Sequence, residues 1–487
     1  QASWVRDNTG LEVQRTFSGG VTVRTERDCF GREVHKSVRS GGIEQGAYRY
    51  QWGIANRLLS KENELTGTVT RYDYDRFDFL IRQETMQGSE TDVIYRVPDF
   101  VGNLFETPDK KDRKYGAGGK LLEDPDCFYH YDDEGNLIFR EFKQLQETGV
   151  KFDRKRMEKE RGIRCLATGT GWLYEWSSNG MLKKVIRPDG RPVEFRYDAL
   201  GRRTAKQYFG QVTRWVWDGN VPIHEWGYKV TDMQPDEEEN TASKEPTEDI
   251  TTWVFEAGTF VPTAKIQDGK QYSIVSDYLG TPIQMYDEQG KKTWECTLDV
   301  YGKATIFEGR SLNECPFRWA GQYIDYETNL CYNRFRYYSS ETGNYLNQDP
   351  IGLVGNNPTL YAYVTDSNMW LDPFGLTAEV YKLVATKSGL YDVYEWGNDT
   401  PVDKIWLNKG DTWKIGETTD FRSRKNRPEI QNRYTQKWLK KNNLEYIPLQ
   451  HSVNKSAKKA FQQFETSRIK KYEKQFGKKP AGNKCHH

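Results

Sequence analysis

The pentapeptide Asp-Pro-X-Gly-Leu occurs twice in the chain, at residues 349–353 and at residues 372–376. The two copies place the carboxylates of Asp349 and Asp372 at matching positions in similar turns. Two carboxylates a few ångströms apart resist ionising together, so one keeps a proton while the other acts as a base. If the residues between the copies fold back as a hairpin, the pair has the groups needed for general acid–base hydrolysis.

The same pentapeptide has a simpler interpretation. Asp, Pro and Gly favour tight backbone bends, and most such motifs are turns without any catalytic role. The residues alone are therefore compatible with two ordinary turns as well as with a catalytic pair.

The elements that must position the two aspartates are short strands. Aromatic residues alternate with polar ones and are followed by a polar turn that usually contains Gly, which predicts strands with one buried face joined by hairpins. The pattern recurs at residues 72–80, 129–138, 174–182 and 195–203, with a looser copy at 48–58. Copies of this kind predict an array in which neighbouring strands bury each other's faces.

These repeats resemble the YD repeats of the Rhs and teneurin-like family, most closely over residues 276–304, 318–353 and 356–376. The resemblance implies a mostly β protein whose strands spiral into a hollow shell, or cocoon, around a C-terminal domain. We therefore expect a shell over residues 1–348, a cleavage region over 349–376 and a small α+β toxin domain over 377–487. Many relatives have longer shells, and the chain starts at Gln1, so we also expect N-terminal sequence to be missing.

The resemblance further implies that Asp349 and Asp372 cleave their own chain between Leu376 and Thr377. One aspartate would activate a water molecule, and the other would protonate the scissile carbonyl. An arginine that relatives often carry before the first motif is replaced here by Asn344, although Arg334 and Arg336 are close in the sequence.

Charge separates the chain into two parts. Residues 377–487 contain 23 Lys and Arg against 12 Asp and Glu, a net charge of +11, while the preceding residues carry a net charge of −10. A basic domain of this size is often a nucleic-acid binder, although a soluble, lysine-rich surface gives the same charge. Residues 231–250 are acidic and nearly free of apolar side chains, and we expect them to form an exposed loop outside the strands.

The basic part, which we call the tail, has the pattern of a small α+β domain. Short strands are predicted at residues 379–385, 389–396, 403–407, 411–416 and 444–449. Helices are predicted at residues 429–441 and 454–476, the second ending at Gly477.

The tail resembles the GIY-YIG nuclease family. The resemblance rests on Gly389-Leu390-Tyr391, Lys414-Ile415-Gly416, Arg424 eight residues after Gly416, Glu465 on the second predicted helix, and Asn483 near the end. It implies a metal-dependent nuclease in which Tyr391 or Lys414 activates water and Arg424 neutralises charge on the phosphate. Glu465 would hold a divalent cation, with Mg²⁺ the expected one, because Mg²⁺ keeps most of its waters and needs few protein ligands.

Two departures weaken the match of individual residues. Lys414 stands where the family usually has tyrosine, and the spacing from Tyr391 to Lys414 is longer than usual, which leaves Tyr381 as an alternative to Tyr391. The terminal Cys485-His486-His487 is not spaced like a zinc site.

The resemblance also implies partners and a location. We expect a nucleic acid as substrate, DNA ahead of RNA, a cognate immunity protein, and secretion-apparatus components such as a type VI spike. The protein would be made in the bacterial cytoplasm, secreted, and active in the cytoplasm of a target cell. No apolar run is long enough for a membrane span.

Two other functions remain open. The tail could be a different toxin enzyme, such as a nucleotide-modifying transferase. The whole chain could instead be a YD-repeat surface or adhesion protein without enzymatic activity.

Overall fold

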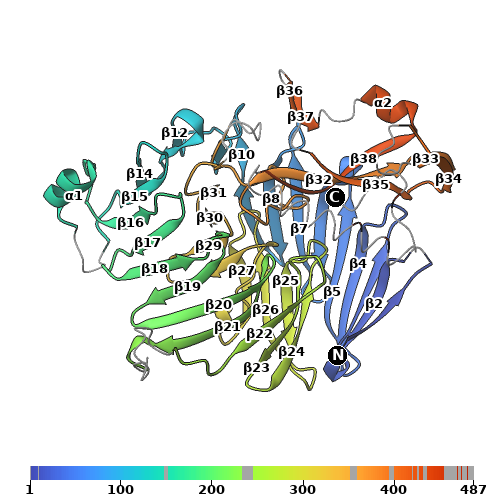
Figure 1. Ribbon diagram of the computed structural model, residues 1–487, viewed down its shortest axis with the longest axis horizontal. Helices are drawn as coiled ribbons and strands as arrows, with labels where there is room; N and C mark the ends of the chain where they lie inside the picture. The colour runs from blue at the N-terminus through green and yellow to red at the C-terminus, as the bar shows by residue number, and fades with distance from the viewer. Residues whose placement is uncertain are drawn as a thin grey trace.

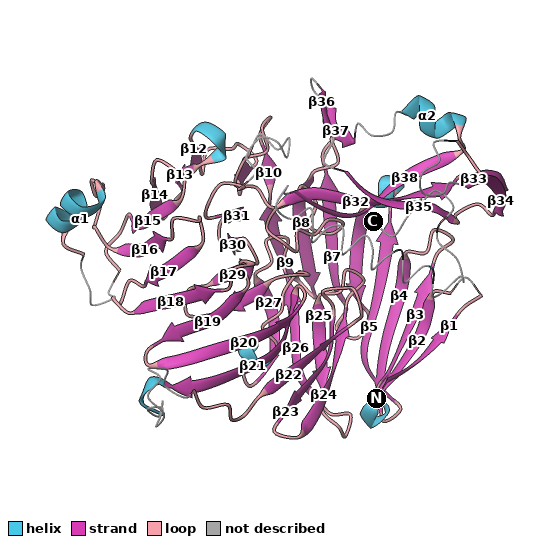
Figure 2. Cartoon of the chain, viewed as in Figure 1, coloured by secondary structure: helices cyan, strands magenta, loops and turns pink. Residues whose placement is uncertain are grey.

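The computed structural model describes residues 2–8, 10–146, 152–232, 245–350, 359–393, 400–418, 421–424, 427–431 and 436–453, together with residues 469, 473 and 480. The chain is mostly β, as the sequence predicts, and the few helices are short and lie at the periphery of the strands (Figure 2).

The N-terminal part forms a nine-stranded antiparallel sheet in which each strand pairs with the next along the chain. Its strands are β1 (Ala2–Arg6), β2 (Glu12–Phe17), β3 (Thr22–Arg27), β4 (Glu33–Ser40), β5 (Ile43–Trp52), β6 (Leu58–Asn63), β7 (Thr68–Tyr74), β8 (Leu80–Gln87) and β9 (Glu90–Tyr95). A two-stranded sheet of β10 (Val97–Pro98) and β11 (Leu104–Phe105) follows it.

A second sheet of sixteen strands has the same sequential order and curves round to face the first (Figure 1). Its strands are β12 (Lys114–Tyr115), β13 (Leu121–Glu123), β14 (Cys127–Tyr131), β15 (Leu137–Phe142), β16 (Gly171–Trp176), β17 (Leu182–Ile186), β18 (Pro192–Tyr197), β19 (Arg203–Tyr208), β20 (Gln211–Asp218), β21 (Val221–Lys229), β22 (Thr251–Phe255), β23 (Pro262–Gln267), β24 (Lys270–Ser276), β25 (Pro282–Tyr286), β26 (Lys292–Leu298) and β27 (Ala304–Gly309). The helix α1 (Arg154–Arg161) interrupts the strands between β15 and β16, and short 3₁₀ turns occupy residues 18–20, 54–56, 117–119, 230–232 and 312–314.

The repeated aspartates of the sequence build the hairpin turns of both sheets. In the turn after β18, the Asp198 carboxylate accepts hydrogen bonds from the backbone N–H groups of Leu200 and Arg202 at 2.9 and 2.8 Å. Gly201 has φ +73° and donates its N–H to the Asp198 carbonyl, a conformation that favours glycine. The alternation of the strands then follows: Val193 and Phe195 of β18 are buried, while Glu194 and Arg196 between them are not.

The two sheets meet along a seam that joins residues far apart in the sequence. The Lys36 ammonium donates to the Ser276 carbonyl at 2.8 Å. The Ser40 hydroxyl donates at 2.5 Å to the carbonyl of Gly290, which is 250 residues away in the sequence. The backbones of Gly19 and Gly290 approach so closely that a Cβ on either would lie within 2.7 Å of the other segment. The seam therefore depends on small residues at the two turns.

A four-stranded sheet lies inside the curve of the sixteen-stranded one. Its strands are β28 (Tyr323–Asp325), β29 (Leu330–Asn333), β30 (Arg336–Ser339) and β31 (Asn344–Tyr345). Tyr332 and Tyr337 pack with Phe195 and Val185 of the outer sheet in one apolar cluster. The residues that lead into the first Asp-Pro motif are thereby fixed against the shell wall.

The tail contains small sheets and one described helix, as expected for an α+β domain. Its three-stranded sheet has the order β35 (Thr412–Thr418), β32 (Thr377–Ala385) and β38 (Leu444–Val453), and these strands cross one end of the sheets in Figure 1. The hairpins are β33 (Gly389–Val393) with β34 (Asp403–Leu407) and β36 (Phe421–Arg424) with β37 (Arg427–Gln431), and the helix is α2 (Gln436–Lys441).

One prediction for the tail is wrong. The helix expected over residues 429–441 begins only at Gln436, because residues 427–431 form β37 and pair with β36. Pro428 and the β-branched Ile430 favour extended backbone, and the hairpin satisfies the backbone groups that a helix would have used. The helix predicted at 454–476 lies almost wholly outside the described residues, although Ile469 and Glu473 within it are helical.

The acidic segment 231–250 connects β21 and β22. Its described ends, residues 231–232 and 245–250, contain no strand, which agrees with the expected loop, and residues 233–244 lie outside the described part of the chain.

Candidate active sites at the chain border and in the tail

Asp372 forms a turn of the same kind as the repeats. The N–H of Leu376 donates to Asp372 Oδ1 at 2.9 Å, and the N–H of Gly375 approaches the Asp372 carbonyl at 3.4 Å. Gly375 has φ +65°. The interpretation of the motif as an ordinary turn is therefore correct for this oxygen of Asp372, whereas the other oxygen, Oδ2, makes its contacts outside the turn.

Arg336 brings the second oxygen of Asp372 together with Asp349. Its Nη2 lies 3.2 Å from Asp349 Oδ2 and 3.5 Å from Asp372 Oδ2, so one nitrogen contacts both carboxylates. The side chain is only 1% exposed and its guanidinium stacks 3.7 Å above the Tyr345 ring. The same group donates to the carbonyls of Gly375 and Leu360. The segment between the two motifs runs back alongside β31, since the N–H of Tyr345 in β31 donates to the carbonyl of Tyr361 in that segment.

The environment of Asp372 changes its acidity. Burial raises the pKa of its carboxyl to about 6, while the Arg336 charge, the Leu376 N–H and the Tyr345 hydroxyl oppose that rise and the charge of Asp349 adds to it. The Tyr345 hydroxyl donates to Asp372 Oδ2 at 2.7 Å. Because the folded pKa exceeds the ordinary value for Asp, this carboxyl holds a proton at a higher pH than an exposed one would.

The bond predicted to be cut is fixed within the protein interior. Leu376 is 0% exposed, and Thr377 begins strand β32. Asn333 donates its side-chain N–H to the Asp372 carbonyl, and a Cβ at Gly321 would lie 2.3 Å from the carbonyl oxygen of Pro373. The backbone around the second motif is therefore held from several sides.

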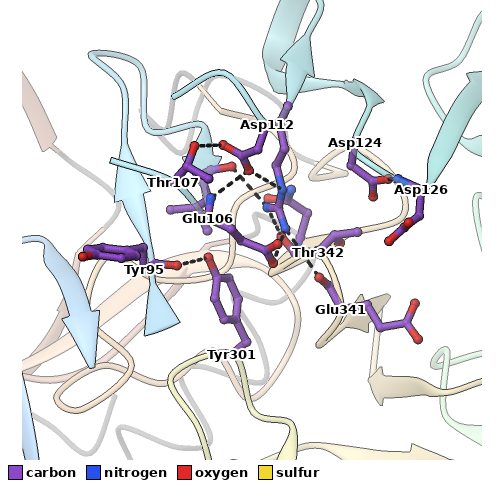
Figure 3. Close-up of polar contacts among 12 residues, drawn as sticks. Tyr95, Glu106, Thr107, Asp112, Asp124, Asp126, Tyr301, Glu341 and Thr342 are labelled. Carbon is purple, nitrogen blue, oxygen red and sulfur yellow. Dashed lines mark hydrogen bonds and ion pairs between the residues drawn. The ribbon is translucent and has the colours of Figure 1, made fainter. Parts of the chain in front are cut away.

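The approach to the first motif is held by a separate buried arginine. Arg113 donates to the carbonyls of Leu104 and Thr342 at 3.1 and 2.7 Å and to the Glu106 carboxylate at 2.6 Å. Figure 3 shows Glu106 and Thr342 converging on this point from different segments, next to the hydrogen bond from the Thr107 hydroxyl to Asp112. These contacts connect the loop after β11 to the residues between β30 and β31.

Sequence reasoning named Arg336 as a neighbour of the motifs but gave it no role. It also missed Tyr345, Asn333 and Gly321. The available signal was a charged residue inside a run of aromatic residues expected to be buried, because a buried arginine needs acidic or carbonyl partners. Asn344, where relatives often carry arginine, is buried in β31, while Arg336 supplies the guanidinium that reaches both aspartates.

In the tail, the strand register separates the two candidate tyrosines. Strand β35 carries Lys414 and pairs with β32, where Leu383 faces Lys414 and Tyr381 faces Gly416. Tyr391 lies instead in β33, which pairs with β34. The described backbone thus places Tyr381, and not Tyr391, on the strand beside the Lys414-Ile415-Gly416 segment.

Tyr391 has the surroundings of a core residue. It packs with Leu383, Trp413 and Leu439, and its hydroxyl lies 2.7 Å from the Lys387 carbonyl oxygen and 2.9 Å from that of Asn443. A hydroxyl in this position donates to a carbonyl, and a phenolate there would face two carbonyl oxygens. This geometry disfavours Tyr391 as a base.

The remaining predicted residues of the tail are placed only in part. Arg424 is the last residue of β36 and lies opposite Arg427, and its side chain is not described. Glu465 and Asn483 lie outside the described residues, so the Mg²⁺ expected at Glu465 stays a prediction. Among the residues that the structure describes, no group of three His, Cys, Asp or Glu side chains could hold a metal ion. None of the helices in the same part of the chain is long and apolar enough to cross a membrane.

Comparison with known proteins identifies the family. Residues 21–362 match the Teneurin YD-shell family, which covers more than half of the chain, and the protein belongs to this family. It is thus an Rhs/YD-repeat protein, as the repeats and the closely matching C-terminal region of the shell indicated.

Three curated relatives match over most of the chain. The probable deoxyribonuclease RhsA of Dickeya dadantii is 27% identical over 76% of this chain and 25% of its own length. The double-stranded DNA deaminase toxin A of Burkholderia cenocepacia is 29% identical over 77% of this chain and 26% of its own length. The toxin protein Tse5 of Pseudomonas aeruginosa is 28% identical over 77% of this chain and 32% of its own length.

The chain therefore spans about a quarter to a third of the length of these relatives. Among solved structures, the TcdB2–TccC3–TEV crystal structure is 19% identical over 77% of this chain and 21% of that chain, with a TM-score of 0.36.

Proposed function

We propose that the protein is a toxin of the Rhs type, in which the β shell encloses the tail and separates from it by cutting the Leu376–Thr377 bond. The observation that carries this proposal is the contact of one buried guanidinium, Arg336, with both Asp349 and Asp372 beside Leu376. The Oδ1 contact alone suffices for the turn at Asp372, and Arg336 brings a second carboxylate to that turn.

The two aspartates divide the acid and base roles. Asp349 takes a proton from a water molecule, whose oxygen adds to the Leu376 carbonyl carbon. Asp372, whose pKa is raised to about 6, gives its proton to the carbonyl oxygen of Leu376. Asp349 then passes the proton that it took from water to the nitrogen of Thr377. The C–N bond then breaks, the carboxyl group remains on Leu376, and the amine leaves on Thr377. Proton exchange with water restores the starting state.

The cleavage proposal is tested by the mass of the folded protein. Purified chain should contain a fragment that starts at Thr377, and Asp349→Asn or Asp372→Asn should leave the chain whole because either variant lacks one member of the pair. A wild-type chain that stays intact at neutral pH after folding would contradict the proposal.

For the tail we propose nucleic-acid cleavage, DNA ahead of RNA. The support is the net charge of +11 and the register that puts Tyr381 and Lys414 on paired strands. Tyr381 replaces Tyr391 as the proposed base. Arg424 neutralises charge on the phosphate, Asn483 completes the site, and Glu465 would hold Mg²⁺, which stabilises the leaving oxygen when bound.

A second candidate function is a different nucleic-acid-modifying tail. The three relatives that match over the shell carry different names, one a deoxyribonuclease and one a DNA deaminase, so membership of the family does not specify the chemistry of the tail. Plasmid and total RNA incubated with the protein and Mg²⁺ distinguish the two. Nicked plasmid or shortened RNA supports the nuclease, and base changes in uncut DNA contradict it.

The proposed partners follow from the same reading. A free nuclease would attack the nucleic acid of its producer, so a cognate immunity protein is expected, and delivery would use secretion-apparatus components such as a type VI spike. An acidic shell around a basic tail favours retention by opposite charge. A YD-repeat adhesion protein would need neither the paired aspartates nor a basic tail.

A further inference from the structure

The hairpin of β33 and β34 has two faces of different character. On one face, Tyr391 and Leu407 are buried in the tail core. On the other face, Leu390 lies directly opposite Trp406 across the strands, and the two side chains are 64% and 62% exposed. Neighbouring side chains along a strand point to opposite faces of the sheet. Because Tyr391 and Leu407 point into the core, Leu390 and Trp406 point outward. The chemistry proposed above uses neither residue.

Charged side chains of both signs surround the exposed pair. Lys404 lies two residues from Trp406 on the same face, and Lys387 and Lys409 are exposed in the segments at the end of the hairpin next to Leu390. Two acidic residues are also present. Asp392 faces Lys404 at 3.7 Å across the strands, and exposed Asp403 lies at the far end of the hairpin. A third acidic residue, Asp411, accepts a hydrogen bond from the N–H of Asn408 at the end of the hairpin next to Lys409. The lysines and the acidic residues around Trp406 are thus equal in number, and the positive charge belongs to the tail as a whole, at +11.

We propose that Trp406 and Leu390, with Lys387, Lys404 and Lys409, form a binding platform for unpaired nucleotides, on which a base stacks on the Trp406 ring while the lysines contact the adjacent phosphates. Exposed aromatic rings with lysines beside them, on a domain of positive net charge, are used by proteins to hold single-stranded nucleic acid. Leu390 lies beside the ring and widens the apolar surface available to the base.

The charges decide against other occupants. A second copy of the tail would bring two domains of net charge +11 together, which repel each other. An acidic inhibitor protein would also suit the lysines, but the tail as a whole has the charge of a domain that binds phosphates. The platform deepens the proposed action on nucleic acid by adding a preference for unpaired strands, and it does not depend on which reaction the tail performs.

The test measures binding by the full chain without divalent cation, so that cleavage does not interfere. The probes are a fluorescently labelled single strand of about 12 nucleotides and the matching duplex, followed by fluorescence anisotropy. Trp406→Ala should weaken single-strand binding by on the order of 10-fold, because stacking of one base is lost, and should change duplex binding much less. Trp406→Phe should retain most of the affinity, since it keeps an aromatic face.

Trp4 supplies a matched control, because it is 52% exposed and lies in the shell, in β1. Trp4→Ala should bind like the wild type. Equal single-strand affinity of Trp406→Ala and the wild type would overturn the proposal, as would an equal loss for both probes. If the wild type cleaves nucleic acid and Trp406→Ala binds single strands as well as the wild type does, only the platform is rejected. If Trp406→Ala binds more weakly but neither protein cleaves, only the nuclease is rejected.

Discussion

Replacing Arg336 by methionine should separate the stability of the chain border from its reactivity. Methionine fills much of the same space but removes the charge that faces Asp349 and Asp372. Removing one partner of a buried ion pair typically costs about 3–5 kcal/mol, because the remaining charge stays buried without compensation. We therefore expect the free energy of unfolding of the shell to fall by about 4 kcal/mol.

Cleavage should slow by roughly 100-fold or more, since the group that orients both carboxylates is lost. The measurements are urea unfolding for stability and a time course of intact mass for cleavage. Arg336→Lys keeps a charge and should recover part of the stability, which guards against a variant that simply fails to fold. A double variant, Arg336→Met with Asp372→Asn, removes a second charge and should also be more stable than Arg336→Met alone, without regaining cleavage.

The neighbouring Arg334 provides the matched control. It is buried in the same turn, but its guanidinium donates to the Leu200 carbonyl at 3.0 Å, and in the described part of the chain no ion pair joins it to either aspartate. Arg334→Met should therefore leave cleavage near the wild-type rate. Wild-type cleavage by Arg336→Met, or an equal loss of cleavage in both methionine variants, would refute the role assigned to Arg336.

Four further predictions follow from single residues. Burial raises the pKa of Asp299 to about 6, so its contribution to stability is fully present below about pH 4 and is lost as pH rises through 6; Asp299→Asn should flatten the pH dependence of urea unfolding over that range. Tyr381→Phe should abolish nuclease activity, whereas Tyr391→Phe should lower stability by about 1 kcal/mol and leave cleavage of plasmid largely intact. Glu465→Ala should remove Mg²⁺-dependent cleavage, and wild-type cleavage by this variant would reject the proposed metal site. Gly321→Ala should displace Pro373 and slow the release of the tail, as seen by intact mass, while an unchanged rate would show that the second motif tolerates the shift.

The shell could be predicted from the sequence because the residues that form each hairpin are close together in the chain. Each Asp-x-x-Gly turn fixes a hairpin through contacts within five residues, as at Asp198, and the alternation of the next strand then decides which face is buried. The pairing of Asp349 with Asp372 could be expected in outline for the same reason. The contact of Arg336 with both aspartates could not be predicted, because the spacing of the two motifs does not indicate which residue of another hairpin lies beside them.

The tail shows where spacing is insufficient. The order Gly-Leu-Tyr followed by Lys-Ile-Gly suggests that Tyr391 and Lys414 share a site, but order along the chain does not reveal which strands are neighbours. Tyr391 lies in the hairpin of β33 and β34, and the strand of Tyr381 takes the place beside β35. The late start of α2 has a similar origin, because pairing of β36 with β37 outweighs the helical tendency of residues 429–431.

The sequential order of the sheets has a consequence for biosynthesis. Since each strand of the two large sheets pairs with the strand made just before it, both can form progressively while the chain leaves the ribosome, without waiting for distant segments. The seam is different, because the contact of Ser40 cannot form until Gly290 has been made, and the tail is synthesised after both. The walls would thus be in place before the tail emerges. A mutation at the seam should then delay maturation late in synthesis, whereas a mutation in a hairpin turn should disturb it early.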